Sequence, residues 1–158
     1  MSFAGTRRWI VKLSKTATMA ALAVSYLAKR RGEGHIQARQ VAEYLGIPTD
    51  SALKVLQALS RRGIIGSHLG RSGGYYLETE PKEVTLLQIV EAVEGPIEGD
   101  IPVESDGNGL AKPIDELKKA CNRVAHSIRA ELGRTSVADM ADLDSKPVLA
   151  TIEHGVAH

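Results

Sequence analysis

The stretch "IIGSHLGRSGGYYL", residues 64–77, sets a glycine-rich basic segment between two apolar, strand-like ends. It holds four of the chain's fifteen glycines. Glycine permits positive φ and lets a backbone approach a partner closely. The stretch therefore predicts a β-hairpin, with strands over 64–69 and 75–77, whose basic tip could lie against a phosphate backbone. Taken alone, it is more typical of an ordinary surface hairpin, so the neighbouring segments must decide its function.

Three helices are predicted before the hairpin. Ser14 can cap a first helix that runs to about Arg31, along which apolar residues recur at helical spacing. A short helix follows over 37–45, and the turn "GIPTDS" leads into a third over 50–62, with Thr49 or Asp50 as its N-cap. Two helices joined by a tight turn make a helix-turn-helix, and a hairpin directly after them makes it a winged one.

The second half of the chain predicts two helices, a loop, and a closing helix. Thr85 caps "LLQIVEAVEG", an acidic loop rich in Gly and Pro spans 95–112, and Pro113 opens a long helix that ends at Gly133 before a short capped helix in "TSVADM". We expect a mainly α fold with a small β-hairpin wing and a long C-terminal dimerisation helix. The expected units are a winged helix-turn-helix domain (12–95), the loop (96–112), the dimerisation and closing helices (113–143) and a flexible tail (144–158).

The long helix carries an apolar seam at heptad spacing over two heptads. It suits a homodimer interface, although a helix packed onto its own domain would show the same spacing. The seam residues are Ile114, Leu117, Cys121, Val124 and Ile128.

Charge divides the chain into two halves. Residues 1–77 carry 12 Lys and Arg against 3 Asp and Glu, whereas residues 78–158 carry 8 against 16. A basic half indicates a polyanionic partner. A single cysteine fits a reducing compartment, and the chain shows neither a signal peptide nor a membrane-spanning run, so we expect a cytoplasmic protein that does not enter a membrane.

Helix-turn-helix proteins insert the second helix of the pair into the major groove of double-stranded DNA, with its N-terminal residues at base edges, and commonly bind palindromes as dimers. Other basic and polar residues would contact phosphates, and the hairpin would touch the backbone. The candidate DNA-binding residues are Lys15, Arg39, Gln40, Thr49, Asp50, Ser51, Lys54, Gln57, Arg61, His68, Gly70, Arg71, Ser72, Gly73, Gly74 and Tyr75.

Four segments together resemble the Rrf family of bacterial winged-helix transcriptional regulators: "LSKTATMAALAVSYLA" (13–28), "QVAEYLGIP" (40–48), "LSRRGIIGSHLGRSGGYYL" (59–77) and "VTLLQIVEAVEG" (84–95). "TSVADM" (135–140) matches the closing helix of the family. The resemblance covers residues 12–143 and implies a dimeric DNA-binding regulator, usually a repressor. The first eleven residues precede it and form a candidate basic arm.

The chain departs from the family at two places. Ser51, Ala52 and Leu53 replace an aromatic–Leu–Glu pattern, so operator preferences of known members do not transfer. Cluster-binding members place three cysteines in the loop before the dimerisation helix, and this loop has none. We therefore predict no iron–sulfur cluster and no other metal or cofactor.

Several functional alternatives stay open. The acidic loop could sense an unidentified small-molecule effector, and Cys121 could form a thiol switch across the dimer. The winged helix could also bind an acidic protein instead of DNA. An enzyme is not expected, because the chain shows no Ser/His/Asp order, no metal-ligand spacing and no phosphate loop.

Overall fold

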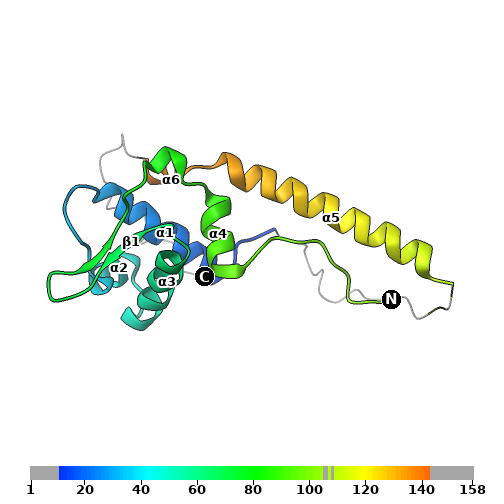
Figure 1. The fold of residues 1–158 in the computed structure, drawn as a ribbon, viewed down its shortest axis with the longest axis horizontal. Coiled ribbons are helices and arrows are strands. Elements are labelled where there is room, and N and C mark those ends of the chain that lie inside the picture. The colour runs from blue at the N-terminus through cyan, green and yellow to red at the C-terminus, as the bar shows by residue number, and fades with distance from the viewer. Residues whose placement is uncertain (1–10, 105–106, 108, 143–158) are drawn as a thin grey trace, which may run out of the picture.

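A computed structural model describes residues 11–104, 107 and 109–142, and it confirms a mainly helical fold with one two-stranded hairpin (Figure 1). Residues 1–10 of the predicted N-terminal arm and the tail from residue 144 lie outside the described residues. The elements in chain order are α1 (Lys15–Lys29), α2 (Ala38–Leu45), α3 (Thr49–Arg61), β1 (Gly66–His68), β2 (Gly74–Tyr76), a 3₁₀ turn η1 (Pro81–Glu83), α4 (Leu86–Glu94), α5 (Ala111–Arg134) and α6 (Val137–Ala141).

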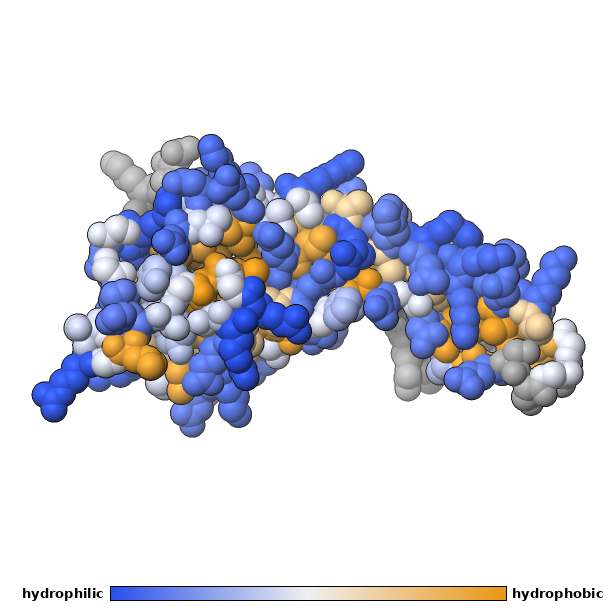
Figure 2. All heavy atoms as spheres, viewed as in Figure 1, coloured by the Kyte–Doolittle hydropathy of each residue, from blue (hydrophilic) through white to orange (hydrophobic). Residues whose placement is uncertain are grey.

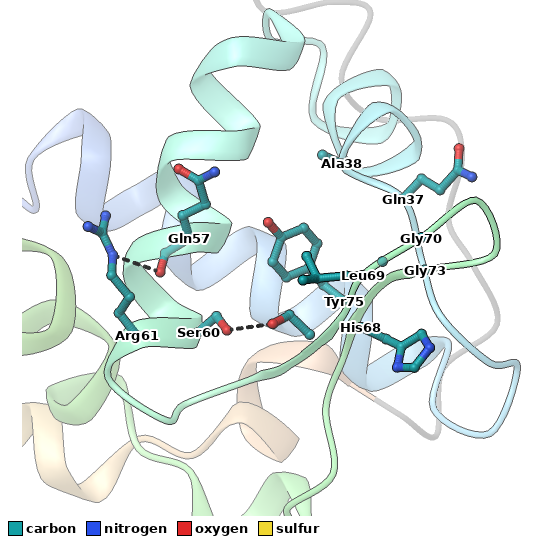
Figure 3. Close-up of a pocket in the computed structure, with 12 residues that line it drawn as sticks. Gln37, Ala38, Gln57, Ser60, Arg61, His68, Leu69, Gly70, Gly73 and Tyr75 are labelled. Atoms are coloured by element: carbon teal, nitrogen blue, oxygen red, sulfur yellow. Dashed lines mark hydrogen bonds between the residues drawn. The ribbon is translucent and has the colours of Figure 1, made fainter.

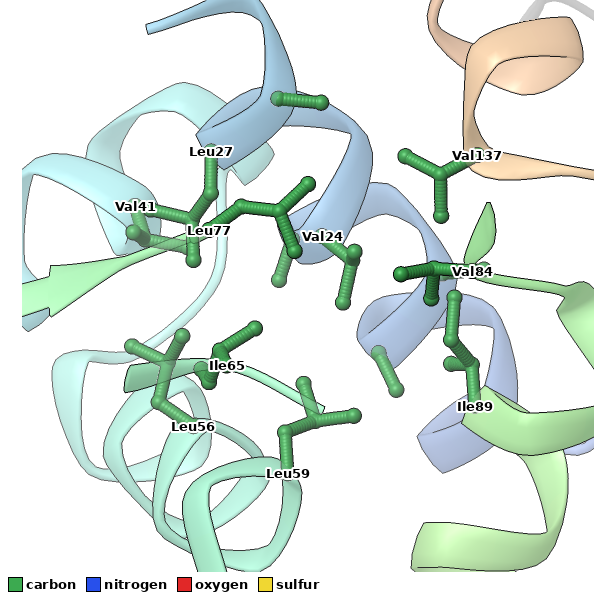
Figure 4. Close-up of a cluster of buried hydrophobic side chains, with 14 of the residues drawn as sticks. Val24, Leu27, Val41, Leu56, Leu59, Ile65, Leu77, Val84, Ile89 and Val137 are labelled. Atoms are coloured by element: carbon green, nitrogen blue, oxygen red, sulfur yellow. The ribbon is translucent and has the colours of Figure 1, made fainter. Parts of the chain in front are cut away.

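Helix α1 lies at the centre of the compact part of the molecule and contacts α2, α3, α4 and α6. Ser14 caps it as predicted, since its side chain accepts a hydrogen bond from the backbone N–H of Ala17 at 3.0 Å. Alanines cover much of the buried face of α1, which lets its neighbours approach closely. The largest fully buried side chains come from α1 itself and from its neighbours: Val24, Leu27, Val41, Leu56, Leu59, Ile89 and Val137 (Figure 4).

The turn between α2 and α3 follows the prediction at its start and differs at its end. Gly46 adopts φ of 64° after α2, a left-handed conformation that suits glycine. The predicted caps Thr49 and Asp50 are wrong, because Pro48 is the N-cap of α3 and no side chain caps the helix. Pro48 has a helical φ of −59° but an extended ψ of 142°, so the helix begins directly after it, at Thr49. Asp50 instead lies in the first turn, where a negative charge is favourable.

The hairpin is shorter than predicted, and a residue outside it, Ile36, pairs with one of its strands. β1 and β2 are antiparallel, and Ser67 faces Tyr75 in the register. Ile36, just before α2, pairs with the outer edge of β2: its N–H donates to the carbonyl of Tyr75 at 2.9 Å, and its carbonyl accepts from the N–H of Tyr75 at 2.8 Å. This pairing fastens the hairpin to the helix-turn-helix. We call residues 66–76 the wing.

The closing helix α6 returns to the compact part of the molecule. The N–H of Val137 donates to the carbonyl of Val84, and the N–H of Leu86 donates to the carbonyl of Thr135, both at 2.8 Å. Val137 is fully buried in the core, and α6 packs against α1 and η1. The chain therefore leaves this unit after α4 and re-enters it after α5.

Helix α5 extends away from the compact part as a long arm, with the 95–104 loop beside it (Figure 1). It continues through the predicted stop at Gly133 and ends at Arg134, because Gly133 keeps a helical backbone and Thr135 turns extended. The loop lies directly on α5: a Cβ added at Gly99 would come within 2.3 Å of the carbonyl carbon of Cys121. No helix in the described part of the chain is both long enough and apolar enough to cross a bilayer.

Candidate nucleic-acid interface

A groove of about 660 Å³ separates the second half of α3 from the wing, and the start of α2 closes one end of it (Figure 3). We call it the α3–wing groove. The groove brings together seven of the predicted DNA-binding residues: Gln57, Arg61, His68, Gly70, Gly73, Gly74 and Tyr75. Sequence reasoning missed five of its lining residues: Gln37, Ala38, Ser60, Ser67 and Leu69.

A hydrogen bond between two side chains joins the walls of the groove. The hydroxyl of Ser60 on α3 donates to that of Ser67 on β1 at 3.1 Å. Beside it, the Nε–H of Arg61 donates to the carbonyl of Gln57 at 3.3 Å, which keeps the guanidinium along the exposed face of α3. Successive side chains of a strand point to opposite faces. The strand pattern of β1 therefore contained a signal for Ser67, which must lie on the opposite face of the wing from His68.

The two faces of the wing differ in what they present. Tyr75 lies on the groove side with Ser67 and is half-buried (Figure 3). The His68 imidazole points away from α3 and stacks on His35, with ring centroids 4.9 Å apart and planes inclined by 7°. His68 thus contributes backbone to the groove, while its ring supports the back of the wing.

The tip of the wing is a tight turn with exposed side chains. The N–H of Gly73 donates to the carbonyl of Gly70 at 3.1 Å, and Gly70 has φ of 108°. Arg71 and Ser72 are exposed between them. Arg71 has no acidic partner among the residues that the structure describes, so its charge is available to a ligand.

The remaining predicted DNA-binding residues lie outside the groove lining. Thr49, Asp50 and Lys54 are exposed at the start of α3, and Ser51 beside them is half-buried.

Two predicted phosphate contacts on α2 already have partners within that helix. Arg39 pairs with Glu43 at 3.5 Å. The side-chain oxygen of Gln40 accepts from the N–H of Gln37 at 2.9 Å, which completes a capping box at the start of α2.

Lys15 is exposed at the start of α1, where its neighbour Ser14 donates a hydrogen bond to Glu94 at the end of α4. The structure therefore does not bring Lys15 together with the groove residues.

An ion pair behind the wing holds the connection between α1 and α2. Arg31 bonds to Glu80 at 2.8 Å and also donates to the carbonyl of Glu78 at 2.9 Å. The hydrogen bond from Arg31 lowers the pKa of the Glu80 carboxyl, and the reciprocal interaction raises the pKa of Arg31. This pair neutralises one cation of the basic half on the side away from α3.

The five predicted seam residues do not share one environment. Ile114 is buried, at 8% exposure, and Cys121 and Ile128 are half-buried. Leu117 and Val124 are 56% and 59% exposed. With Leu110 they form a line at heptad spacing, which we call the α5 stripe. Figure 2 shows hydrophobic residues gathered near the free end of the arm among hydrophilic ones.

The arm and the compact part are joined by a partly buried ion pair. Arg129 on α5 pairs with Glu91 on α4, and the same carboxylate accepts a hydrogen bond from the N–H of Ile97 in the loop at 3.1 Å. A second groove, of about 410 Å³ and largely apolar, opens beside this junction between the starts of α1 and α4 and the end of α5, with Ile97 in its wall.

The donor set does not fit an iron–sulfur cluster. The chain has one cysteine, and no group of three or more His, Cys, Asp or Glu side chains in the described residues could hold a metal ion. Cys121 lies on α5 beneath Gly99. Cluster ligation needs several thiolates or imidazoles in one place.

A helix-turn-helix with a basic wing defines the class of this protein: a winged-helix DNA-binding transcriptional regulator, and not an enzyme. Residues 13–143 match the Rrf2 family model, described as an iron-dependent transcriptional regulator. The chain therefore belongs to the Rrf2 family.

Three known relatives match most of this chain and nearly all of their own length. The HTH-type transcriptional repressor NsrR of Streptomyces coelicolor is 27% identical over 140 residues, covering 88% of this chain and 94% of the relative. The solved structure of CymR, the global cysteine regulator of B. subtilis, has a TM-score of 0.64 and 26% identity, covering 84% of this chain and 98% of that one. T. potens IscR gives a TM-score of 0.63 at 25% identity, with 89% and 93% covered.

Proposed function

We propose that this protein is a homodimeric repressor that binds a palindromic DNA operator and carries no iron–sulfur cluster. The observation that carries the proposal is the α3–wing groove. It sets the exposed face of α3 beside a glycine-rich tip whose Arg71 has no acidic partner in the described chain.

In this proposal α3 enters the major groove. Thr49, Asp50, Ser51 and Lys54 face base edges, because the N-terminal end of the second helix reads sequence in this class of protein. Lys54 would donate to acceptors on guanine, and Asp50 would accept from the amino group of cytosine. Gln57 and Arg61 follow on the groove side, and Arg71 meets phosphate from the wing.

The α5 stripe is the proposed dimer contact. An exposed line of large apolar side chains on a solvated helix favours association with a second copy. A dimer presents two α3 helices, which suits two half-sites about one helical turn of DNA apart, or a multiple of that distance. The printed name of the S. coelicolor relative, a transcriptional repressor, supports repression as the mode of regulation.

We propose that the protein works without an iron–sulfur cluster because it lacks the side chains that would bind one. The 95–104 segment contains no cysteine or histidine, and the single Cys121 cannot by itself ligate a cluster. The signal would then reach the DNA-binding unit by another route. The Glu91 junction, which connects the loop, α4 and α5, is the proposed route for that signal.

Selection of bound sequences from random double-stranded DNA tests the proposal, with reduced and peroxide-treated protein in parallel. We expect an enriched palindrome whose half-sites are spaced by whole helical turns, and the same result after removal of iron. Recovery of no preferred sequence, together with capture of an acidic protein by the basic face, would favour the protein-interaction alternative. Loss of binding only after oxidation, with a Cys121-linked dimer on non-reducing gels, would favour the thiol switch.

A further inference from the structure

Leu69 at the tip of the wing is the most exposed large hydrophobic residue in the described part of the chain, at 92%. It lies one residue beyond β1 and directly before Gly70. It is absent from the hydrophobic core and from the residues packed against it. A single exposed leucine is ordinary on a protein surface, so its place in the wing must decide whether it has a role.

Three features of the tip give Leu69 a fixed and exposed position. The hydrogen bond between Gly73 N–H and the Gly70 carbonyl closes the turn that follows it. A Cβ at Gly73 would lie 2.1 Å from the carbonyl oxygen of His68, so the two sides of the tip are in close contact. The bonding of Ile36 to Tyr75 fastens the base of the wing. Leu69 therefore projects into solvent from a narrow turn whose backbone is held in place by hydrogen bonds.

Leu69 also lines the α3–wing groove, beside the unpaired cation Arg71. The minor groove of B-DNA is about 6 Å wide and offers apolar sugar walls with few distinguishing polar groups. Minor-groove proteins use a leucine among cationic residues as a wedge that partly separates two base pairs and bends the duplex. The wing tip likewise combines a leucine with an arginine. The glycines that flank these side chains keep the tip narrow enough to enter the minor groove.

We propose that Leu69 is an apolar wedge that the wing places in the minor groove next to the α3 binding site, with Arg71 at the adjacent phosphates. This inference rests on the proposed DNA-binding function and adds a specificity-determining residue to it. Flexible pyrimidine–purine steps such as TA open at lower cost than stiff A-tract steps. Leu69 would thereby select sequence at base pairs that no hydrogen bond reads.

The test compares the wild type with Leu69→Ala and Leu69→Met at the tip, and with the control Thr79→Ala at an exposed position after the wing that has no proposed DNA contact. The DNA is the selected operator and a copy in which the TA step under the wing is replaced by AA. Binding is followed by fluorescence anisotropy across a salt series, and bending by energy transfer between dyes at the two DNA ends.

We expect Leu69→Ala to bind the operator about tenfold more weakly, the size of one lost specific contact. It should also bend DNA less and no longer distinguish TA from AA. Leu69→Met and Thr79→Ala should behave like the wild type. The salt slope of Leu69→Ala should stay unchanged, because no charge is removed.

Wild-type affinity, bending and TA preference in Leu69→Ala would overturn the wedge and leave DNA binding intact. Absence of any selected operator for the wild type would instead overturn the proposed function, and the wedge with it.

Discussion

Gly74 occupies a position that tolerates no other residue without strain. Its φ is 153°, and an added Cβ would lie 2.5 Å from the carbonyl oxygen of Ile36. That carbonyl accepts the hydrogen bond from Tyr75 that fastens the wing. A side chain at this position would therefore separate the wing from α2 as well as strain the backbone.

We expect Gly74→Ala to lower the free energy of unfolding by about 2 kcal/mol, a typical cost of backbone strain, and to weaken DNA binding. Urea denaturation measures the first effect and a gel-shift titration the second. Thr79→Ala, five residues away at an exposed position after the wing, is the control and should change neither. Equal stability of the two variants would mean that the pairing with Ile36 contributes little.

Asp139 illustrates how a single carboxylate fixes the start of α6. Its side chain accepts hydrogen bonds from the N–H of Ser136 at 2.8 Å and from the hydroxyl of Ser136 at 2.9 Å. These bonds, the backbone one first, lower the pKa of Asp139. The stabilisation is therefore fully present above the ordinary pKa of an aspartate and disappears as pH falls through the lowered value.

We expect Asp139→Asn to be less stable than the wild type at neutral pH, with the difference shrinking below about pH 4 as the wild-type carboxylate becomes protonated. Urea unfolding at pH 7, 5 and 3 measures it. Glu104→Gln removes an exposed charge in the loop that makes none of these hydrogen bonds, and its stability should follow the wild type. A difference that persists unchanged to pH 3 would contradict the assignment.

At the scale of elements, α5 has two apolar faces. Ile114 is buried and Ile128 lines the groove beside α1 and α4, while Leu117 and Val124 are exposed to solvent. The heptad seam in the sequence contains both sets, so spacing alone could not separate residues that support the arm from residues free to meet a second copy.

A charge on the solvent-facing set should prevent dimerisation. We expect Leu117→Glu to give a monomer by light scattering coupled to size exclusion, because a buried unpaired carboxylate is costly in an apolar interface. Asn122→Glu places the same charge on an exposed position of α5 outside the stripe and should remain dimeric. A dimeric Leu117→Glu protein would exclude the stripe as the interface.

At the scale of the whole molecule, charge and architecture coincide. The basic half builds the helix-turn-helix and wing, and the acidic half builds α4, the loop and the arm. Affinity for DNA should therefore fall steeply with salt, as phosphate contacts release counterions.

Arg71→Ala should weaken binding to every DNA sequence and reduce the slope of log affinity against log salt by about one. Anisotropy titrations at four or more salt concentrations measure this slope. Arg134→Ala removes an equal charge from the end of α5, where Arg134 already pairs with Glu131 at 3.1 Å, and should leave the slope unchanged. An unaltered slope in Arg71→Ala would remove the wing arginine from phosphate contact.

The sequence by itself determined the local parts: the first helix with its Ser14 cap, the glycine turn after α2, the Thr85 cap, the short capped helix in "TSVADM", and the hairpin. These follow from spacing and capping within a few residues, so their physical cause is contained in short windows. The predicted cap of α3 was wrong because Thr49 is already helical and Pro48, with an extended ψ of 142°, takes the N-cap position in place of the usual Thr or Asp.

Only the tertiary structure decided which distant segments meet. It paired Ile36 with Tyr75, turned His68 onto His35, joined Ser60 to Ser67, and returned Val137 to the core beside α1. Such contacts depend on how the helices pack around α1, and no periodicity within one segment encodes the angle at which another segment crosses it. The α3–wing groove arises from that packing, although the sequence had already supplied most of the residues that line it.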